Sequence, residues 1–439
     1  MSALEQVVPE GYKQTEVGLI PINWSLKKLE HLTSLIIDGT HHTPTYTSFG
    51  VPFLRVTDIQ GPLDDSKFKY VSEQEHKVLI KRCKPELGDL LLSKNGTIGI
   101  PKVVDWEWEF SVFVSLALIK PIKKLLNSSY LEQYFKSDFL KLQLSQRAKQ
   151  GTVTNLHLEE IRELLIPVPE AFKEQTAIAN ALSDVDALLT ELEKLLSKKQ
   201  AIKTATMQQL LTGKTRLPQF STYIEGEKQG LPKGTKSSEL GEIPEDWDVV
   251  SLGDIGNTVI GLTYSPNDVA EYGTLVLRSS NVQKNTLAYE NNVFVDMDLP
   301  ERVIVKEGDI LVCVRNGSRN LIGKCALIDK YAEGSAFGAF MSIYRTKQSK
   351  FIFFQFQSNV IQNQINEIMG ATINQITNKD MAAFKVPLPS DEKEQTAIAT
   401  ILSDMDNEIQ TLEQRLAKTR QIKQGMMQEL LTGRTRLPF

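Results

Sequence analysis

Glu174-Gln175-Thr176-Ala177-Ile178-Ala179 decides the fold of this chain, because the same six residues return at positions 394–399. A second stretch, Leu-Leu-Thr-Gly-Lys-Thr-Arg-Leu-Pro at residues 210–218, returns at 430–438 with a single Lys-to-Arg difference. The shift is 220 residues at both ends, from 174 to 394 and from 210 to 430. The chain therefore contains two copies of one ancestral unit, and duplicated halves commonly pack about a pseudo-two-fold axis.

The repeat extends to the start and the middle of each half. A Gly-x-Ile-Pro-x-x-Trp motif occupies residues 18–24 and 241–247. Shorter matches join Leu54-Arg55 to Leu277-Arg278, Gly88–Leu91 to Gly308–Leu311, Asn95-Gly96 to Asn316-Gly317, and Ile166–Pro169 to Val386–Pro389. Between these matches the halves differ widely. A molecule with this symmetry suits a target with two separated, inverted parts, and duplex DNA is the commonest such target.

Composition bounds the class of protein. A chain of 439 residues is expected to form two to four units, and 41% hydrophobic with 24% charged residues is typical of soluble globular proteins. No apolar run approaches the roughly 20 residues that span a bilayer, and the N-terminus has no secretion signal. The three cysteines, Cys83, Cys313 and Cys325, show no paired spacing, so we expect a reducing cytoplasm. The net charge of −4 requires that a DNA-binding surface be locally basic, or that a partner supply positive charge.

Apolar residues recur at alternating spacings of four and three near the end of each half, as in a coiled coil. The positions predicted to pack are Ile178, Leu182, Val185, Leu189, Leu192 and Leu196 in the first half, and Ile398, Leu402, Met405, Ile409, Leu412 and Leu416 in the second. A buried face of an ordinary helix gives the same stripe, but two stripes of equal length favour two helices packed antiparallel on each other. About 40 residues make each helix roughly 60 Å long, and Gly213 and Gly433 fit their C-terminal caps.

The variable regions between the repeated motifs predict mixed helices and strands. Residues 90–92 and 310–312 predict buried strands after a Gly-Asp turn, and one amphipathic helix is expected over Tyr130–Gln146 and another over Phe351–Ile368. The fold class is α+β, with two similar mixed domains separated by an antiparallel pair of long coiled-coil helices in a pseudo-two-fold arrangement. The predicted boundaries are a first variable domain at 1–170, a first spacer helix at 171–213, a linker at 214–243, a second variable domain at 244–390 and a second spacer helix at 391–439.

Several patterns resemble catalytic or cofactor sites but lack essential parts. Gly213-Lys214-Thr215 resembles the end of a phosphate-binding loop, yet residue 208 is Gln where that loop needs Gly. The acidic residues near His76 loosely match a metal-dependent nuclease without a counterpart in the second half, and His41-His42 lacks further zinc ligands. We therefore expect no catalytic residue, no metal and no bound cofactor in this chain.

Recognition of bases in a DNA groove requires polar and basic side chains on loops held by a rigid scaffold. The candidates in the first half are Thr40, His41, His42, Thr43, Arg55, Lys94, Asn95, Thr97, Arg147, Lys149 and Thr152. Those in the second half are Thr263, Tyr264, Ser265, Arg278, Arg315, Asn316, Ser318, Arg319, Asn320, Asn374 and Gln375. Any single one could be an ordinary surface residue, and Arg55 and Arg278 could be internal salt-bridge partners. The occurrence of such loops at matching places in both halves favours contact with DNA.

The C-terminal parts of both long helices are basic. Residues 197–216 contain five Lys and Arg residues and no acid, and residues 417–436 contain five against Glu429 alone. These residues could track DNA phosphates between two recognition domains. They could equally suit helix C-termini through the macrodipole.

Taken together, these motifs resemble the specificity (S) subunit of type I restriction-modification enzymes. The resemblance is carried by the Glu-Gln-x-x-Ile-Ala start and Leu-Leu-Thr-Gly end of each long helix, by the Gly-x-Ile-Pro-x-x-Trp motifs and by residues 38–44, Asp-Gly-Thr-His-His-Thr-Pro. It implies two target-recognition domains, each reading one half of an asymmetric bipartite DNA site. It further implies that the helix pair fixes the number of unread base pairs, with the domains about one helical turn, roughly 34–36 Å, apart.

The resemblance also implies partners and cofactors outside this chain. Two modification (M) subunits would bind S-adenosylmethionine and methylate adenine by base flipping, and two restriction (R) subunits would use ATP and Mg²⁺ for translocation and cleavage. These partners would supply much of the positive charge around the DNA. The chain itself is then a non-catalytic cytoplasmic subunit. The alternatives are a self-contained nuclease or methyltransferase, a specificity subunit of a methylation-only system, or a coiled-coil adaptor that never touches bases.

Overall fold

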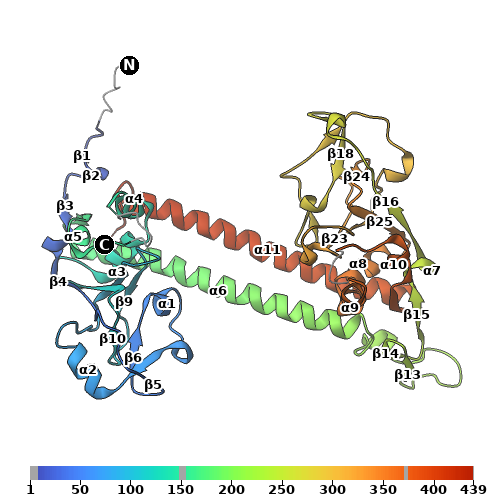
Figure 1. Ribbon diagram of the computed structural model, residues 1–439, viewed down its shortest axis with the longest axis horizontal. Helices are drawn as coiled ribbons and strands as arrows, with labels where there is room; N and C mark the ends of the chain where they lie inside the picture. Colours follow the sequence, from blue (N-terminus) through green and yellow to red (C-terminus); the bar gives the residue numbers. More distant parts are fainter. Residues whose placement is uncertain (1–7, 148–154, 370–373, 439) are drawn as a thin grey trace. The chain divides into compact units, whose positions relative to one another are not determined.

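The chain forms two compact units in the computed structural model, which describes residues 8–147, 155–369 and 374–438 (Figure 1). The first unit comprises Met1–Lys194 with Gln414–Phe439, and the second comprises Leu195–Glu413. Each unit therefore combines one variable region with the start of its own long helix and the end of the long helix of the other half. Among the described residues, no helix is both long enough and apolar enough to cross a membrane.

The first unit consists of short strands and short helices around the start of α6 (Phe172–Leu210). Its strands are β1 (Tyr12–Thr15), β2 (Gly18–Pro21), β3 (Trp24–Lys28), β4 (Thr33–Asp38), β5 (Tyr46–Thr47), β6 (Val51–Leu54), β7 (Lys69–Val71), β8 (Leu90–Ser93), β9 (Pro101–Val103), β10 (Ser111–Val112), β11 (Leu116–Pro121) and β12 (Leu165–Pro169). Its short helices are α1 (Val56–Ile59), α2 (Glu73–Leu79), α3 (Ser128–Phe135), α4 (Asp138–Arg147) and α5 (Leu158–Arg162). The two larger sheets have the strand orders β4-β11-β8-β9 and β10-β6-β7-β5.

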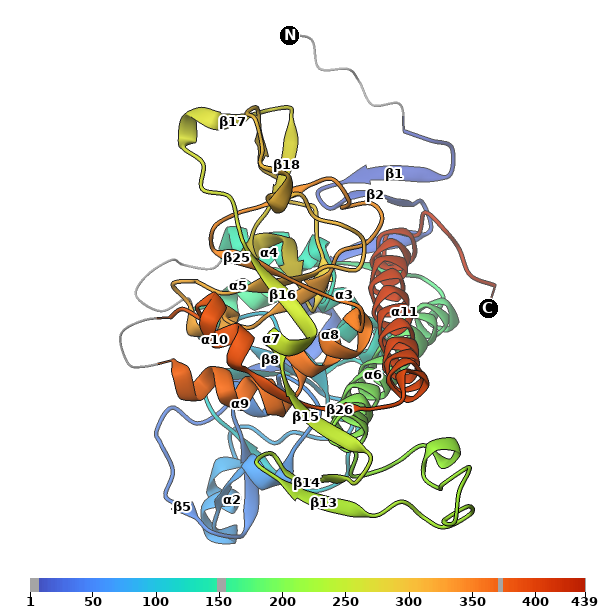
Figure 2. The same ribbon diagram turned by 90° about the vertical axis from the view of Figure 1, so that its right-hand side faces the viewer.

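The second unit repeats this architecture around the start of α11 (Glu392–Leu430), as the view in Figure 2 shows for its helices and strands. Its strands are β13 (Thr235–Ser238), β14 (Gly241–Pro244), β15 (Trp247–Ser251), β16 (Gly256–Ile260), β17 (Val269–Ala270), β18 (Thr274–Leu277), β19 (Val282–Gln283), β20 (Thr286–Leu287), β21 (Phe294–Val295), β22 (Ile310–Cys313), β23 (Cys325–Leu327), β24 (Ala336–Phe337), β25 (Met341–Thr346) and β26 (Lys385–Pro389). Its short helices are α7 (Leu252–Ile255), α8 (Ser349–Gln357), α9 (Asn359–Ile368) and α10 (Asn378–Ala383). The sheet order β16-β25-β22-β23 matches β4-β11-β8-β9, and the parallel pair β18-β24 matches β6-β10. The α+β fold class with two similar mixed domains is confirmed.

The predicted strands after the Gly-Asp turns are confirmed as β8 and β22, and all four residues of each are buried. Successive side chains of a strand point to opposite faces of its sheet. Leu90 and Leu92 accordingly lie in one hydrophobic cluster while Leu91 lies in another. Both faces of the sheet are covered at this place, which explains why consecutive residues of β8 are apolar.

The helices expected over Tyr130–Gln146 and Phe351–Ile368 are each divided into two, so the prediction of one helix in each half was wrong. Ser137 separates α3 from α4: its hydroxyl donates to the carbonyl of Tyr134 and accepts from the amide of Leu140. Ser358 separates α8 from α9, and its hydroxyl donates to the carbonyl of Gln355 but does not accept a hydrogen bond from α9. The Ser137 hydroxyl therefore ends one helix and caps the next.

The repeated motifs of the sequence meet at one junction in each unit. In the second unit, Nε of Arg216 lies 2.6 Å from Oε1 of Glu394, and Nη1 lies 2.7 Å from Oδ1 of Asp246. The indole of Trp247 donates a hydrogen bond of 3.1 Å to Glu394, whose side chain is only 1% exposed. The corresponding residues of the first unit are Arg436, Glu174 and Trp24. Three separate motifs therefore depend on one buried carboxylate.

Glycine ends each long helix where the chain turns toward this junction. Gly213 and Gly433 have φ of +68° and +69°. A Cβ atom would lie 2.4 Å from Cδ of Pro244 at Gly213, and 2.5 Å from Cγ of Pro21 at Gly433. The predicted helix caps are confirmed, and Gly213-Lys214-Thr215 ends a helix as expected.

The long helices α6 and α11 pack antiparallel within each unit. In the second unit, Lys199 lies 2.6 Å from Glu408 and Lys203 lies 2.5 Å from Asp406, so positions rise along α6 as they fall along α11. The ion pairs of the first unit are Asp186–Lys423 at 2.5 Å and Glu193–Arg420 at 2.6 Å. Burial raises the pKa of Asp186, but hydrogen bonds from Gln133 and Lys423 outweigh it and hold this pKa below its usual value.

The predicted apolar stripe serves the domain cores as well as the helix pair. Ile178 and Leu182 lie in the hydrophobic core of the first unit, and Ile398 and Leu402 lie in that of the second. The later stripe positions, Val185, Leu189, Leu192, Leu196, Met405, Ile409, Leu412 and Leu416, are buried or half-buried. Six of the ten cations in the basic helix ends have carboxylate partners in their own unit: Lys199, Lys203, Arg216, Arg420, Lys423 and Arg436. These internal pairs weigh against the phosphate-tracking alternative.

Arg216→Ala is expected to lower the free energy of unfolding by about 3–5 kcal/mol, because it leaves the buried Glu394 carboxylate unpaired. Arg436→Ala should cost less, since the Arg436 side chain is 35% exposed against 11% for Arg216. Urea unfolding measures both. The matched control is the exposed neighbour Lys214→Ala, which should stay within about 0.5 kcal/mol of wild type. Equal midpoints for Arg216→Ala and the control would contradict the importance of the junction.

Candidate nucleic-acid interface

One glycine in each unit fixes the start of a candidate loop. A Cβ atom at Gly39 would lie 2.0 Å from the carbonyl oxygen of Val112, and one at Gly261 would lie 2.2 Å from that of Gly338. Only glycine permits this close approach of two backbones. The loops at residues 39–44 and 261–266 are therefore equivalent, and each is anchored on the parallel strand pair of its own unit.

Asp38 organises the candidate residues of the first unit. Its carboxylate, only 5% exposed, lies 2.8 Å from Nη2 of Arg82, 3.1 Å from Nε2 of His41 and 3.2 Å from Nζ of Lys94. Burial raises the pKa of Asp38, but hydrogen bonds from Arg82, His41 and Lys94 outweigh burial and hold the pKa below its usual value. Since the Lys94 side chain is only 7% exposed, its ammonium group supports the loop and does not lie free at the surface.

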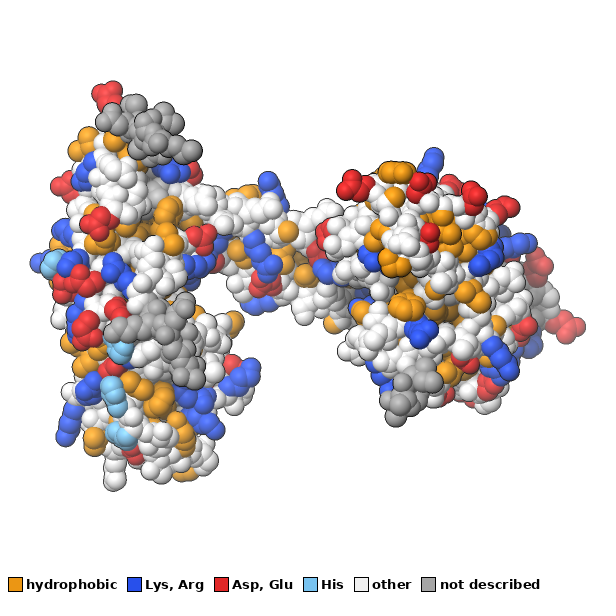
Figure 3. Space-filling view, turned by 45° about the horizontal axis from the view of Figure 1, so that its top comes forward, with side chains coloured by type: hydrophobic (Ala, Val, Ile, Leu, Met, Phe, Trp, Pro, Cys, Tyr) orange, Lys and Arg blue, Asp and Glu red, His pale blue; other side chains and the backbone are white. Residues whose placement is uncertain are grey.

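The neighbouring loop residues of the first unit lie at its surface. The imidazoles of His41 and His42 are 64% and 68% exposed, and Figure 3 shows histidine side chains on this unit. The hydroxyl of Thr40 lies 2.8 Å from Nδ1 of His42. Asn95 forms an isolated β-bridge with Asn155, which ties the turn after β8 to the segment before α5. The two imidazoles are therefore exposed, whereas the predicted DNA contact Thr40 is buried and Asn95 is half-buried, so these two residues support the loop.

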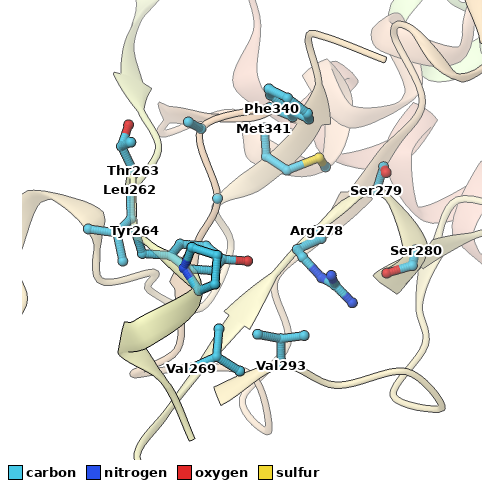
Figure 4. Close-up of a pocket in the computed structure, with 13 residues that line it drawn as sticks. Leu262, Thr263, Tyr264, Val269, Arg278, Ser279, Ser280, Val293, Phe340 and Met341 are labelled. Carbon is cyan, nitrogen blue, oxygen red and sulfur yellow. The ribbon is translucent and has the colours of Figure 1, made fainter. Parts of the chain in front are cut away.

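The second unit has a cavity of about 780 Å³ beside its candidate loops. Thr263, Tyr264 and Arg278 are among the residues that line it (Figure 4). The amide of Asn316 donates a hydrogen bond of 3.2 Å to the hydroxyl of Ser279, which also lines the cavity. The guanidinium of Arg315 lies 5.3 Å from the ring centre of another lining residue, Phe340. Three loops far apart in the sequence thus meet at one place.

The two turns after the buried strands correspond with a shift of 220 residues. Arg315 forms an isolated β-bridge with Gln375, and Asn95 forms one with Asn155. Arg315 is therefore the counterpart of Asn95. The match of Asn95-Gly96 with Asn316-Gly317 was therefore wrong by one residue. The second unit offers a guanidinium where the first offers an amide, and the two units present different donors on the same backbone.

The structure places the other candidate residues as follows. Exposed positions are Thr43, Thr97, Ser265, Ser318, Arg319 and Asn320, and half-buried positions are Arg55, Arg147 and Asn374. Arg55 pairs with Asp58, Arg147 ends α4, and the amide of Asn374 donates to the carbonyl of Gly317. Lys149 and Thr152 lie outside the described residues. Contact of any of these residues with DNA stays a prediction.

Several residues of the two clusters escaped the sequence reasoning. Arg82 and Asn155 are far from the loops they support, and no local pattern marks them. Ser279 and Ser280 directly follow the repeated Leu-Arg pair, and this position in the sequence could have marked them as candidate residues. Phe340 directly precedes β25, but its 55% exposure is seen only in the structure. Within the described residues, no group of three or more His, Cys, Asp and Glu side chains could hold a metal ion.

The family model of the type I restriction modification DNA specificity domain matches this chain twice, at residues 43–204 and 244–421. The putative type I restriction enzyme MjaX specificity subunit of Methanocaldococcus jannaschii is 29% identical over 450 residues, which cover 98% of this chain and 97% of that protein. The EcoKI specificity subunit of Escherichia coli is 27% identical over 202 residues, 44% of this chain and 43% of that protein.

Two solved structures share the fold. The S subunit of a type I restriction-modification system from M. genitalium superposes with a TM-score of 0.59 at 16% identity, over 93% of this chain and 96% of that chain. A chain from a study of complex assembly and conformational transition of the type I R-M system gives a TM-score of 0.52 at 15% identity, over 95% and 99% of the two chains.

Asp38→Asn is expected to lower the free energy of unfolding by about 3–5 kcal/mol near neutral pH, because buried Lys94 loses its carboxylate partner. The folded pKa of Asp38 lies below the value of about 3.9 of an unfolded Asp. Its contribution is therefore complete above that value and is lost as the pH falls through the folded pKa. Urea unfolding from about pH 7 to about pH 3 should show the difference between variant and wild type shrinking in acid.

The exposed carboxylate of Asp65 provides the control for this experiment. Asp65→Asn should stay within about 0.5 kcal/mol of wild type across the range. A difference between Asp38→Asn and wild type that does not change with pH would contradict the role given to the Asp38 carboxylate.

Proposed function

Because the chain belongs to the type I restriction modification DNA specificity family, we propose that it reads an asymmetric, bipartite DNA site, with each recognition domain reading one half. The observation that carries this proposal is the pair of equivalent loop clusters with different side chains. Each cluster begins at a glycine pressed against a neighbouring strand, Gly39 or Gly261. One scaffold used twice with different donors suits two different half-sites.

The chemistry of the loops supports recognition in the major groove. There each base pair presents its own pattern of hydrogen-bond donors and acceptors. The first unit presents the imidazoles of His41 and His42, and the second presents the hydroxyl of Thr263 and the guanidinium of Arg315. All four residues are exposed. Such groups on rigid supports lose little conformational entropy when they bind.

The chain would act as a non-catalytic scaffold for two M and two R subunits in the cytoplasm. A structural neighbour comes from a study of complex assembly in the type I R-M system, which supports such a complex for this chain. S-adenosylmethionine would bind the M subunits, and ATP with Mg²⁺ would bind the R subunits. The purified chain assayed alone with S-adenosylmethionine, ATP and Mg²⁺ should show no turnover. If the chain alone methylates or cleaves DNA, it is a self-contained enzyme and this proposal is wrong.

Replacement of residues 22–170 by the equivalent segment of another family member is expected to change one half of the methylated site and leave the other half unchanged. The segment contains the first loop cluster, and the second cluster is built entirely from residues of the second unit. Methylome sequencing of cells that carry the chimera with its M subunit measures the site. A change in both halves, or in neither, would contradict independent recognition by the two domains.

The paired helices are proposed to set the number of unread base pairs between the half-sites. Four residues inserted after Leu192 and four after Leu412, at equivalent positions of α6 and α11, keep the helices matched. At 1.5 Å per residue they add about 6 Å, which corresponds to about two base pairs of B-DNA. Methylome sequencing should show a spacer longer by about two base pairs with both half-sites unchanged. If the spacer length stays unchanged, the paired helices do not set the number of unread base pairs.

A further inference from the structure

Two arginines occupy equivalent places in the two units but have different partners. Arg55 follows β6 and Arg278 follows β18, each directly after the strand that pairs in parallel with its neighbour. Nε and Nη2 of Arg55 donate hydrogen bonds of 3.0 Å each to the two carboxylate oxygens of Asp58. The Asp58 side chain is only 3% exposed. The guanidinium of Arg55 is therefore neutralised and held by its own loop.

Asn281 stands where the first unit has Asp58, three residues after the arginine. Its side-chain oxygen accepts from the backbone amide of Arg278 at 3.0 Å, and its amide donates to the carbonyl of Ala288 at 2.8 Å. Asn281 is fully buried, and these bonds turn it away from the guanidinium. Within the part of the chain that the structure describes, Nη2 of Arg278 donates to the carbonyl of Asn291 at 3.1 Å and to no other group. Among the described residues, Nε of Arg278 has no hydrogen-bond partner.

The guanidinium of Arg278 has no carboxylate partner among the described residues, and Arg278 lines the cavity of the second unit (Figure 4). Of the described residues that line this cavity, Arg278 alone is charged. Apolar side chains, among them Val269, Val293 and Phe340, form much of the wall. Gly338 lines the cavity without a side chain, whereas its counterpart in the first unit is Phe113, whose ring centre lies 6.1 Å from that of Phe53. Both Gly338 and Phe113 donate their amide to the residue before the arginine, which establishes the equivalence.

An apolar cavity with one unpaired guanidinium matches the edge of a base better than it matches a phosphate. Guanine presents two adjacent acceptors, O6 and N7, which the planar fork of arginine contacts together. The surrounding apolar wall excludes water and suits the flat edge of a neighbouring base pair or a thymine methyl group. A phosphate would gain from several cations, and the lining supplies one.

We propose that Arg278 reads a guanine in the half-site of the second recognition domain, whereas Arg55 is a structural residue of the first. The inference rests on the proposed function and adds to it the identity of one base and the residue that selects it. One substitution, Asp58 in the first unit against Asn281 in the second, decides whether the arginine at this position is held internally or is free for DNA.

The test compares the full chain, assembled with its M subunits, as wild type, Arg278→Ala and Arg278→Lys, with Arg55→Ala as the matched control. Binding is measured with unmethylated DNA at fixed salt. The DNA carries either the site that the complex methylates or a single-base-pair variant of either half-site. Arg278→Ala should weaken binding to the wild-type site about 10- to 100-fold and abolish discrimination at one G·C pair of the second half-site. Arg278→Lys, which cannot form the two-pronged contact, should show most of this loss.

Arg55→Ala should leave the base preferences of both half-sites unchanged and lower only the thermal midpoint of unfolding. A uniform loss of affinity over all sequences in Arg278→Ala would identify a phosphate contact and overturn the proposal. Unchanged discrimination would also overturn it. Absence of sequence-specific binding by the wild-type assembly would instead overturn the proposed function, so the two failures are distinguishable.

Substitution of the residue that lies three positions after each arginine, Asn281 or Asp58, gives an independent test. Asn281→Asp places a carboxylate beside Arg278 and should reproduce the loss of discrimination seen with Arg278→Ala while the arginine is still present. Asp58→Asn leaves the recognition of the second half-site unchanged and serves as the matched control. Full retention of discrimination in Asn281→Asp would show that the unpaired state of Arg278 is not what selects the base.

Discussion

A buried carboxylate at the start of each long helix is the contact on which the rest of the structure depends. Glu394 and Glu174 are almost fully enclosed, and an unpaired charge in such a place costs several kcal/mol. Each is therefore bound to an arginine just beyond the end of the other long helix, Arg216 or Arg436. Because this arginine also packs over the tryptophan at the start of the domain, the helix start, the helix end and the domain are fixed by one interaction. The repeated motifs of the sequence are the parts of this junction, which explains why they are equal in both halves.

The loops that carry the candidate residues inherit their rigidity from the sheets behind them. The central strands β8 and β22 are buried on both faces, so the turns that follow them start from fixed points. The scaffold decides where a side chain stands but not which one it is. The first unit fills the base of its loop with the buried Asp38–Lys94 pair, and the second has Ile260 and Val314 at the same backbone positions. Val314 is buried but Ile260 is 60% exposed, so the second unit has one buried apolar residue where the first has a buried ion pair.

The sequence predicted most of the framework, because the repeats, the apolar periodicity and the glycine caps are local signals. It failed where a local signal was ambiguous or where a contact joins distant segments. The apolar pattern runs on through Ser137, so only the hydrogen bonds of its hydroxyl reveal that the helix ends there. The two Asn-Gly turns looked equivalent because turns favour these residues, yet the β-bridges place Arg315 opposite Asn95. The cavity could not be predicted at all, since its lining comes from four segments that meet only in the folded unit.

Because the chain contains the same unit twice, a comparison of its two halves distinguishes residues that maintain the backbone from residues that contact the ligand. Positions that are the same in both halves, such as the glycines that press on a neighbouring strand, serve the backbone, because the same geometry needs them twice. Positions that differ on that common backbone are free to serve the ligand. The arginine after the parallel strand belongs to both groups, since it is present twice but is neutralised once. Its partner decides its role: a carboxylate three residues on makes it part of the framework, and an amide that turns to the backbone releases it toward the cavity. A change of one residue can therefore alter what a domain recognises while its fold remains the same.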